Sequence, residues 1–133
     1  MDMNINSDDF VFLPLGGSGE IGMNANLYHY KGRWLMVDLG ISFPDESMPG
    51  VDVVLPDLQF IESRKDKLEA IILTHAHEDH FGAIQYLWKR LSVPVYGTAF
   101  TLALLRRKLA ESRLDYKIPL HELDFNITYD FGP

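Results

Sequence analysis

Three histidines and two carboxylates fall within seven residues of this chain, in the run Thr-His-Ala-His-Glu-Asp-His at 74–80. His75 and His77 are two positions apart, so on an extended chain their side chains point to the same side and can share one metal ion. Asp79 and His80 follow where the pattern turns helical, and they can reach a second metal ion. These residue types at this spacing indicate a binuclear metal site.

The ligand types restrict which metals fit. Imidazole and carboxylate groups without a thiolate favour zinc, with manganese or iron as competitors. Two such metals roughly 3.5–4 Å apart can activate a water molecule and clamp both oxygens of a displacement at phosphorus or carbonyl carbon. A single histidine near a strand end is usually a hydrogen-bonded surface or core residue, but three histidines beside an aspartate would be costly to bury unpaired. The metal interpretation is therefore favoured.

Two metals with open positions need about six or seven protein ligands, whereas the run at 74–80 supplies only part of that set. Of the other histidines, His29 lies inside a predicted hairpin and His121 lies near the C-terminal end. His121 is a candidate for a fifth ligand, although a surface role is the favoured interpretation.

Two further features lie where predicted strands end. Asp38 follows an apolar run and is either a strand-ending cap or an acceptor that orients a metal-bound histidine through its other N–H. The local sequence leaves both roles open. The loop at 16–22 is rich in glycine, which permits close backbone approach to a ligand. Because the loop lacks the lysine-serine ending of a P-loop, a tight strand connection is its favoured role.

Hydrophobic periodicity and turn residues predict the elements that must position these groups. Strands are expected at 10–15, 24–30, 33–38, 70–74 and 93–96, with weaker edge strands at 118–120 and 126–129. Helices are expected at 57–62 with Asp57 as the cap, from Asp79 to Leu91, and after the capping residue Thr98, and a long loop is expected at 41–56. This order of strands and helices indicates an α/β layered domain.

Composition excludes several classes of protein. The chain has 133 residues, 47% of them apolar, and no cysteine, so disulfides and thiolate metal sites are excluded. Its net charge of -7 argues against a generally basic surface that coats nucleic acid. No secretion signal is visible and no stretch is apolar for long enough to span a membrane, so we expect a cytoplasmic protein with no membrane partner.

The wider sequence is similar to a known family. His-Ala-His-Glu-Asp-His at 75–80 matches the HxHxDH signature of the metallo-β-lactamase superfamily, whose fold is a four-layer αββα sandwich. The sequence around this motif resembles the N-terminal part of the ribonuclease J family, in the β-CASP branch of that superfamily. The segments that carry this resemblance are Leu-Gly-Gly-Ser-Gly-Glu-Ile-Gly-Met-Asn at 15–24, Val-Asp-Leu-Gly-Ile-Ser-Phe-Pro at 37–44, Pro-Gly-Val-Asp at 49–52, Leu-Pro-Asp at 55–57 and Phe-Gly-Ala-Ile at 81–84.

The resemblance implies roles for named residues. His75 and His77 would bind the first metal, and Asp79 and His80 the second, with Asp79 also orienting the nucleophile as the catalytic carboxylate. Asp38 would match the early aspartate of the superfamily, which favours the role of orienting a metal-bound histidine. The glycine-rich loop would border the active site, through Gly16, Gly17, Ser18, Gly19 and Glu20. Two divalent metal ions, with zinc favoured and manganese as the competitor, would be the cofactors.

Family members are several times longer, and their remaining metal ligands come after the point where this chain ends. We therefore expect residues 1–9 to form a flexible N-terminus and residues 10–133 to be the N-terminal portion of a metallo-β-lactamase domain, without the β-CASP and C-terminal domains. By the resemblance, the full-length protein is a metal-dependent ribonuclease, a 5′-to-3′ exonuclease and endonuclease acting on RNA.

Two alternatives stay open at this point. The same metal motif serves hydrolases of small esters, thioesters or lactams. The chain by itself could also be an inactive structural or partner-binding piece, because its ligand set is incomplete. The isolated chain is expected to be inactive and to associate with itself through an exposed sheet edge or face, or to be ordered only within a longer molecule.

Overall fold

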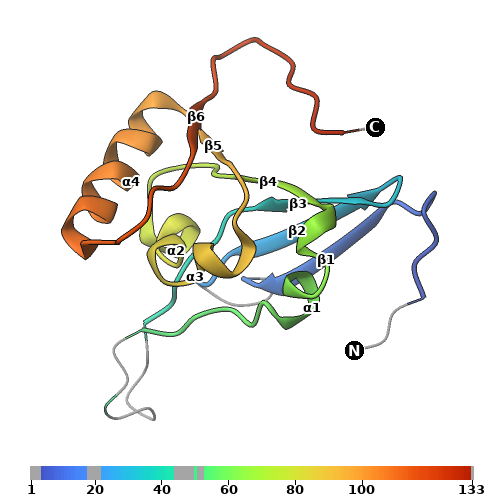
Figure 1. Ribbon diagram of the computed structural model, residues 1–133, viewed down its shortest axis with the longest axis horizontal. Helices are drawn as coiled ribbons and strands as arrows, with labels where there is room; N and C mark the ends of the chain where they lie inside the picture. The colour runs from blue at the N-terminus through green and yellow to red at the C-terminus, as the bar shows by residue number, and fades with distance from the viewer. Residues whose placement is uncertain (1–3, 18–21, 44–49, 51–52, 133) are drawn as a thin grey trace.

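A six-stranded mixed sheet forms the centre of the molecule (Figure 1). The computed structural model describes residues 4–17, 22–43, 50 and 53–132. The strands lie in the sheet in the order of the sequence: β1 (Val11–Gly16), β2 (Ala25–Tyr30), β3 (Arg33–Val37), β4 (Leu68–Ile72), β5 (Val95–Gly97) and β6 (Leu120–Glu122).

Strand direction brings several chain ends to one edge of the sheet. Strands β1, β2 and β3 pair antiparallel, and β3, β4, β5 and β6 pair parallel. The carboxyl ends of β3 and β4 therefore lie side by side. Because β2 runs the other way, its amino end meets them there, with Asn26 opposite Val37. The carboxyl end of β1 joins them, with Gly16 opposite Ala25.

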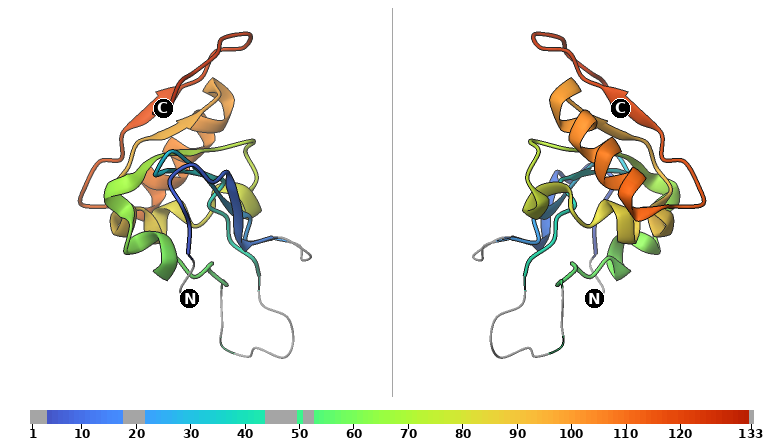
Figure 2. Two further views of the ribbon diagram at one scale, coloured as in Figure 1. Left: turned by 90° about the vertical axis from the view of Figure 1, so that its right-hand side faces the viewer. Right: turned by 90° about the vertical axis from the view of Figure 1, so that its left-hand side faces the viewer.

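Among the described residues, four helices and a 3-10 turn connect the strands: α1 (Gln59–Glu62), the turn η1 (Lys65–Lys67), α2 (Glu78–Phe81), α3 (Ile84–Leu91) and α4 (Ala99–Ser112). Alternate residues of β2 and β3 enter one hydrophobic core together with apolar residues of α1, α3 and α4. Figure 2 shows the sheet from two sides and α4 running beside β5 and β6. Four large apolar residues of α3 and α4 are buried in this core: Trp88, Leu91, Leu102 and Leu105.

Most predicted elements are present, and three differ. The short helix begins at Gln59 with Leu58 as its cap, although the Asp57 carboxylate still accepts the Gln59 N–H at 2.9 Å. The predicted strand at 126–129 is wrong, because Asn126 has a φ of 63° and the described chain after β6 contains no strand. The helix predicted from Asp79 is two helices, α2 and α3, separated at 82–83.

The other boundaries shift by a few residues. Strand β4 ends at Ile72, so Leu73 and Thr74 lead out of the sheet toward the histidine run. Thr98 caps α4 as predicted, accepting the N–H of Thr101. In the part of the chain that the structure describes, no helix combines the length and the apolar character needed to cross a membrane. The predicted α/β fold is confirmed.

Candidate metal centre

The histidine run lies at the sheet edge where the strand ends meet. It follows the carboxyl end of β4, and Asp38 follows the carboxyl end of the neighbouring parallel strand β3. Asn24 directly precedes β2 and therefore reaches the same edge. Crevices outside the carboxyl ends of parallel strands are common ligand sites in α/β sheets.

The three histidine rings of the run form one cluster. The ring centroids of His75 and His80 are 3.8 Å apart, and those of His75 and His77 are 4.7 Å apart. Asp79 joins the cluster because its Oδ2 lies 3.5 Å from Nε2 of His80. The spacing of the motif thus brings together all four residues that the sequence predicts as metal ligands.

Asp38 is the buried anchor of this cluster, with only 3% of its surface exposed. Its Oδ1 accepts the backbone N–H of Thr74 at 2.8 Å, and its Oδ2 accepts the Thr74 hydroxyl at 2.8 Å. The same Oδ2 lies 2.7 Å from Nδ1 of His80. Asp38 therefore fixes both the exit from β4 and the orientation of one histidine, which is the contact expected of a residue that positions a metal-bound imidazole.

This network also selects histidine tautomers. A carboxylate can only accept, so Nδ1 of His80 carries a proton, and in the neutral ring Nε2 then presents a lone pair. The Thr74 hydroxyl donates to Asp38, so it accepts from Nδ1 of His75, which lies 3.0 Å away. In the neutral form of both rings Nε2 is therefore the unprotonated nitrogen. That is the form of imidazole that binds a metal ion.

Replacing Asp38 by Asn is expected to lower the free energy of unfolding by about 2 kcal/mol, because a buried amide cannot accept all three hydrogen bonds. Asparagine also tolerates the φ of 67° at this position, so backbone strain does not contribute to the change in the free energy of unfolding. Denaturant unfolding measures the loss. Asp66→Asn, at an exposed position in η1, is the matched control and should change stability by less than about 0.5 kcal/mol. Equal stabilities for the two variants would contradict the anchoring role.

Asn24 links the glycine-rich loop to this cluster. Its backbone N–H and its side-chain amide both donate to the backbone oxygen of Asp79 at 3.0 Å. On its other side it packs so closely on Gly17 that a Cβ there would lie 3.0 Å from Cα of Asn24 and would overlap its Oδ1. Gly17 therefore borders the cluster through Asn24, and Gly16 packs on the preceding residue, Met23. The predicted loop residues Ser18, Gly19 and Glu20 lie outside the described residues.

The donor types in this cluster fit a divalent cation, because imidazole nitrogen and carboxylate oxygen lie within a few ångströms of each other. Among the described residues, however, no three histidine, aspartate or glutamate groups are arranged around a common point that could hold a metal ion. The cluster in this chain is a partial ligand set.

Glu78, between His77 and Asp79 in the sequence, connects the cluster to α4. Its carboxylate accepts a hydrogen bond from Lys108 Nζ at 2.6 Å, and both side chains are about one-third exposed, at 40% and 32%. This hydrogen bond raises the pKa of the Lys108 ammonium above its ordinary value of 10.5, although burial acts in the opposite direction. The charged pair therefore ties α4 to α2.

A double-mutant cycle with Glu78→Gln and Lys108→Met is expected to give a coupling energy of about 0.5 kcal/mol, because solvent screens a half-exposed pair. The coupling is full from neutral pH up to about 10.5, and it is lost as the pH rises through the raised pKa of Lys108 in the folded protein. Salt at 1 M should reduce it. The exposed pair Arg107–Glu111, at 3.8 Å, is the control and should show weaker coupling. Equal coupling in the two pairs would refute the inference that Glu78 and Lys108 link α2 to α4.

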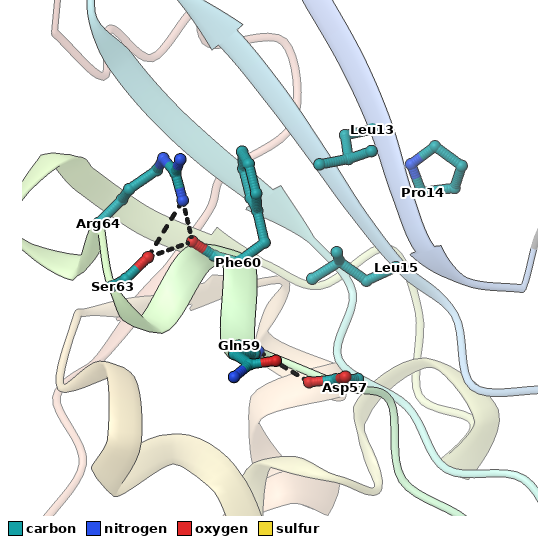
Figure 3. A pocket seen from close by; sticks show the side chains of 8 residues that line it. All are labelled: Leu13, Pro14, Leu15, Asp57, Gln59, Phe60, Ser63 and Arg64. Atoms are coloured by element: carbon teal, nitrogen blue, oxygen red, sulfur yellow. Dashed lines mark hydrogen bonds between the residues drawn. The ribbon is translucent and has the colours of Figure 1, made fainter. Parts of the chain in front are cut away.

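A cavity lies elsewhere, between β1 and α1. It has a volume of about 620 Å³ and is lined by Leu13, Pro14, Leu15, Asp57, Gln59, Phe60, Ser63 and Arg64 (Figure 3). Its polar side chains bond within their own segment: Arg64 donates to the Phe60 carbonyl at 2.8 Å and to Ser63 Oγ at 3.1 Å. No residue of the histidine cluster lines it.

The structure separates the two remaining histidines from the cluster. His121 is exposed on β6 and stacks on Tyr96 with ring centroids 4.9 Å apart. His29 is buried in β2, where its Nδ1 lies 2.8 Å from the backbone oxygen of Asp9. Sequence reasoning assigned no role to Thr74 and Asn24, although both stand in the quoted motifs. Their roles come from partners distant in the sequence.

Comparison with known proteins finds a matching family model and curated relatives. The model of the metallo-beta-lactamase superfamily matches residues 19–132. The chain is 52% identical over 117 residues to ribonuclease J of Sinorhizobium meliloti. This match covers 85% of this chain and 21% of that protein. The chain is 42% identical over 118 residues to ribonuclease J2 of Bacillus subtilis, with 89% and 21% covered. The chain thus spans about a fifth of the length of these curated relatives.

A solved structure shows the same fold. The zinc-bound PqqB protein of Methylobacterium extorquens superposes with a TM-score of 0.56 at 15% identity, covering 84% of this chain and 39% of that one. The similarity concerns the fold alone.

Proposed function

Because the chain belongs to the metallo-β-lactamase superfamily, which binds divalent metal ions, we propose that it is the N-terminal part of a metal-dependent ribonuclease. The observation that carries the proposal is the histidine cluster, with Asp38 directing the Nε2 lone pair of His80 outward. Its similarity to ribonuclease J proteins favours RNA over the small esters, thioesters and lactams that the same motif can serve.

The proposed ligands divide into two pairs. His75 and His77, two positions apart, hold one cation, and Asp79 and His80 hold the other, with zinc favoured for both by the donor types. Ions held there would supply an activated water for attack on a phosphodiester and would stabilise the leaving oxygen. Asp79 orients the attacking water, and Asp38 holds His80 in the required tautomer. The missing ligands come from parts of the longer protein.

Further features of the proposal rest on the same assignment. The substrate is RNA, cut from the 5′ end and internally, and the proposed compartment is the cytoplasm. The exposed rings of Phe10 and Phe12, at 72% and 50% exposure, support self-association of the isolated chain. By itself, with a partial ligand set, the chain is proposed to be inactive.

One assay separates the proposed substrate class from its competitor. The full-length protein is incubated in parallel with a 5′-monophosphorylated RNA, a chromogenic ester and a lactam, each with and without a chelator. Chelator-sensitive cleavage of RNA alone supports the proposal. Hydrolysis confined to the small molecules would reverse it.

A further inference from the structure

The carboxamide of Asn24 lies between the two groups proposed to share a cation. Its Nδ2 is 3.0 Å from the backbone oxygen of Asp79, 3.5 Å from Oδ2 of Asp79 and 3.3 Å from Nε2 of His80. A carboxamide nitrogen carries two hydrogens. One is donated to the Asp79 carbonyl, and the other points to the carboxylate and the imidazole.

At this point Nε2 of His80 is an acceptor. Its ring carries the proton on Nδ1, which lies 2.7 Å from Asp38, so the lone pair of Nε2 faces the Asn24 amide. A cation that binds His80 through Nε2 needs this same lone pair. The hydrogen bond from Asn24 and the bond to a cation are therefore mutually exclusive.

The backbone of Asn24 is held independently of its side chain. Its N–H donates to the Asp79 carbonyl at 3.0 Å, and its carbonyl accepts the Gly40 N–H at 3.0 Å. These bonds stay in place if the carboxamide rotates or is removed. A cation therefore has to displace only the side chain, and the turn that carries Asp79 keeps its backbone support.

We propose that Asn24 is a positioning residue whose carboxamide stands in for a cation between Asp79 and His80 in the metal-free protein and swings away when a cation binds. This inference rests on the proposed function, which supplies the cation. The carboxamide keeps the two ligands together without metal. The carboxamide also opposes metal binding, because its hydrogen bonds to Asp79 and His80 must break before a cation can bind. Asn24 therefore sets the affinity of the Asp79–His80 pair for a cation.

The test uses the metal-free full-length protein, titrated with zinc against a chromogenic chelator and melted in parallel. Asn24→Ala should bind zinc about two- to tenfold more tightly, because a competing hydrogen bond is gone, and should melt at a lower temperature without metal. Asn24→Asp should bind zinc more tightly still, because it adds a carboxylate ligand. It should also melt lower without metal, because it places two carboxylates together.

Asn26→Ala, in β2 two residues after Asn24, is the control. It should match the wild type in zinc affinity and in melting temperature. Weaker zinc binding by both Asn24 variants would overturn the inference in favour of a purely supporting role, and unchanged binding would overturn it outright. If Asn24→Ala does not fold, Asn24→Asp decides by the same criteria. If the Asn24 variants show the expected changes in zinc affinity but the full-length protein cuts no RNA, the proposed function is overturned and this inference stands.

Discussion

Replacing His77 by Ala or Asp79 by Asn in the full-length protein is expected to lower RNA cleavage by more than about a hundredfold. Residues that only support a metal ligand typically change affinity or activity by 10–100-fold, so loss of a ligand itself should have a larger effect. The fold should persist, because the Asp79 side chain is 38% exposed and His77 is exposed. Initial rates on a labelled RNA measure the first effect, and thermal melting measures the second.

His121→Ala is the matched control for these variants. His121 is exposed on β6 and stacks on Tyr96, away from the cluster, so its removal should leave cleavage near the wild-type rate. Wild-type turnover in either the His77 or the Asp79 variant would refute the assignment of the metal ligands. A large loss in the His121 variant would instead restore that histidine as a ligand.

The clustering of the four proposed ligands could be predicted because it depends on local spacing alone. His75 and His77 needed only the alternation of an extended chain, and Asp79 and His80 needed only the following turn. Thr74 and Asn24 escaped prediction because their partners are remote. Thr74 bonds to Asp38, 36 positions away, and Asn24 bonds to Asp79, 55 positions away. Such pairs depend on how β2, β3 and β4 meet at one edge.

The break between α2 and α3 has the same origin. In a continuous helix, Ala83 would donate its N–H to the carbonyl of Asp79, four residues earlier. Here the Asp79 carbonyl already accepts two hydrogen bonds from Asn24, and the Ala83 N–H donates to Leu39 at 3.0 Å instead. Tertiary hydrogen bonds thus replace helical ones at the site. The helical spacing of apolar residues continues through the break and gives no sign of it.

These tertiary bonds require close backbone contact at Gly40. Leu39 and Ile41 donate their N–H groups to the carbonyls of His80 and Glu78, and Gly40 donates to Asn24. The segment after β3 therefore lies directly against the turn that carries the proposed ligands. A Cβ at position 40 would lie 2.6 Å from the His80 backbone nitrogen and would overlap the Asp79 carbonyl oxygen. No side chain fits there without moving that turn.

Gly40→Ala is therefore expected to lower the free energy of unfolding by about 3 kcal/mol, at the upper end of the range for overpacking, because the atoms it meets are backbone atoms. Urea unfolding of the full-length protein measures the loss, and zinc titration should show weaker binding as Asp79 and His80 are pushed apart. Gly32→Ala is the control: an added Cβ there meets nothing within 4 Å, and its φ of 77° alone should cost about 1 kcal/mol without changing zinc affinity. A Gly40 variant as stable as the Gly32 variant would show that the two segments do not touch.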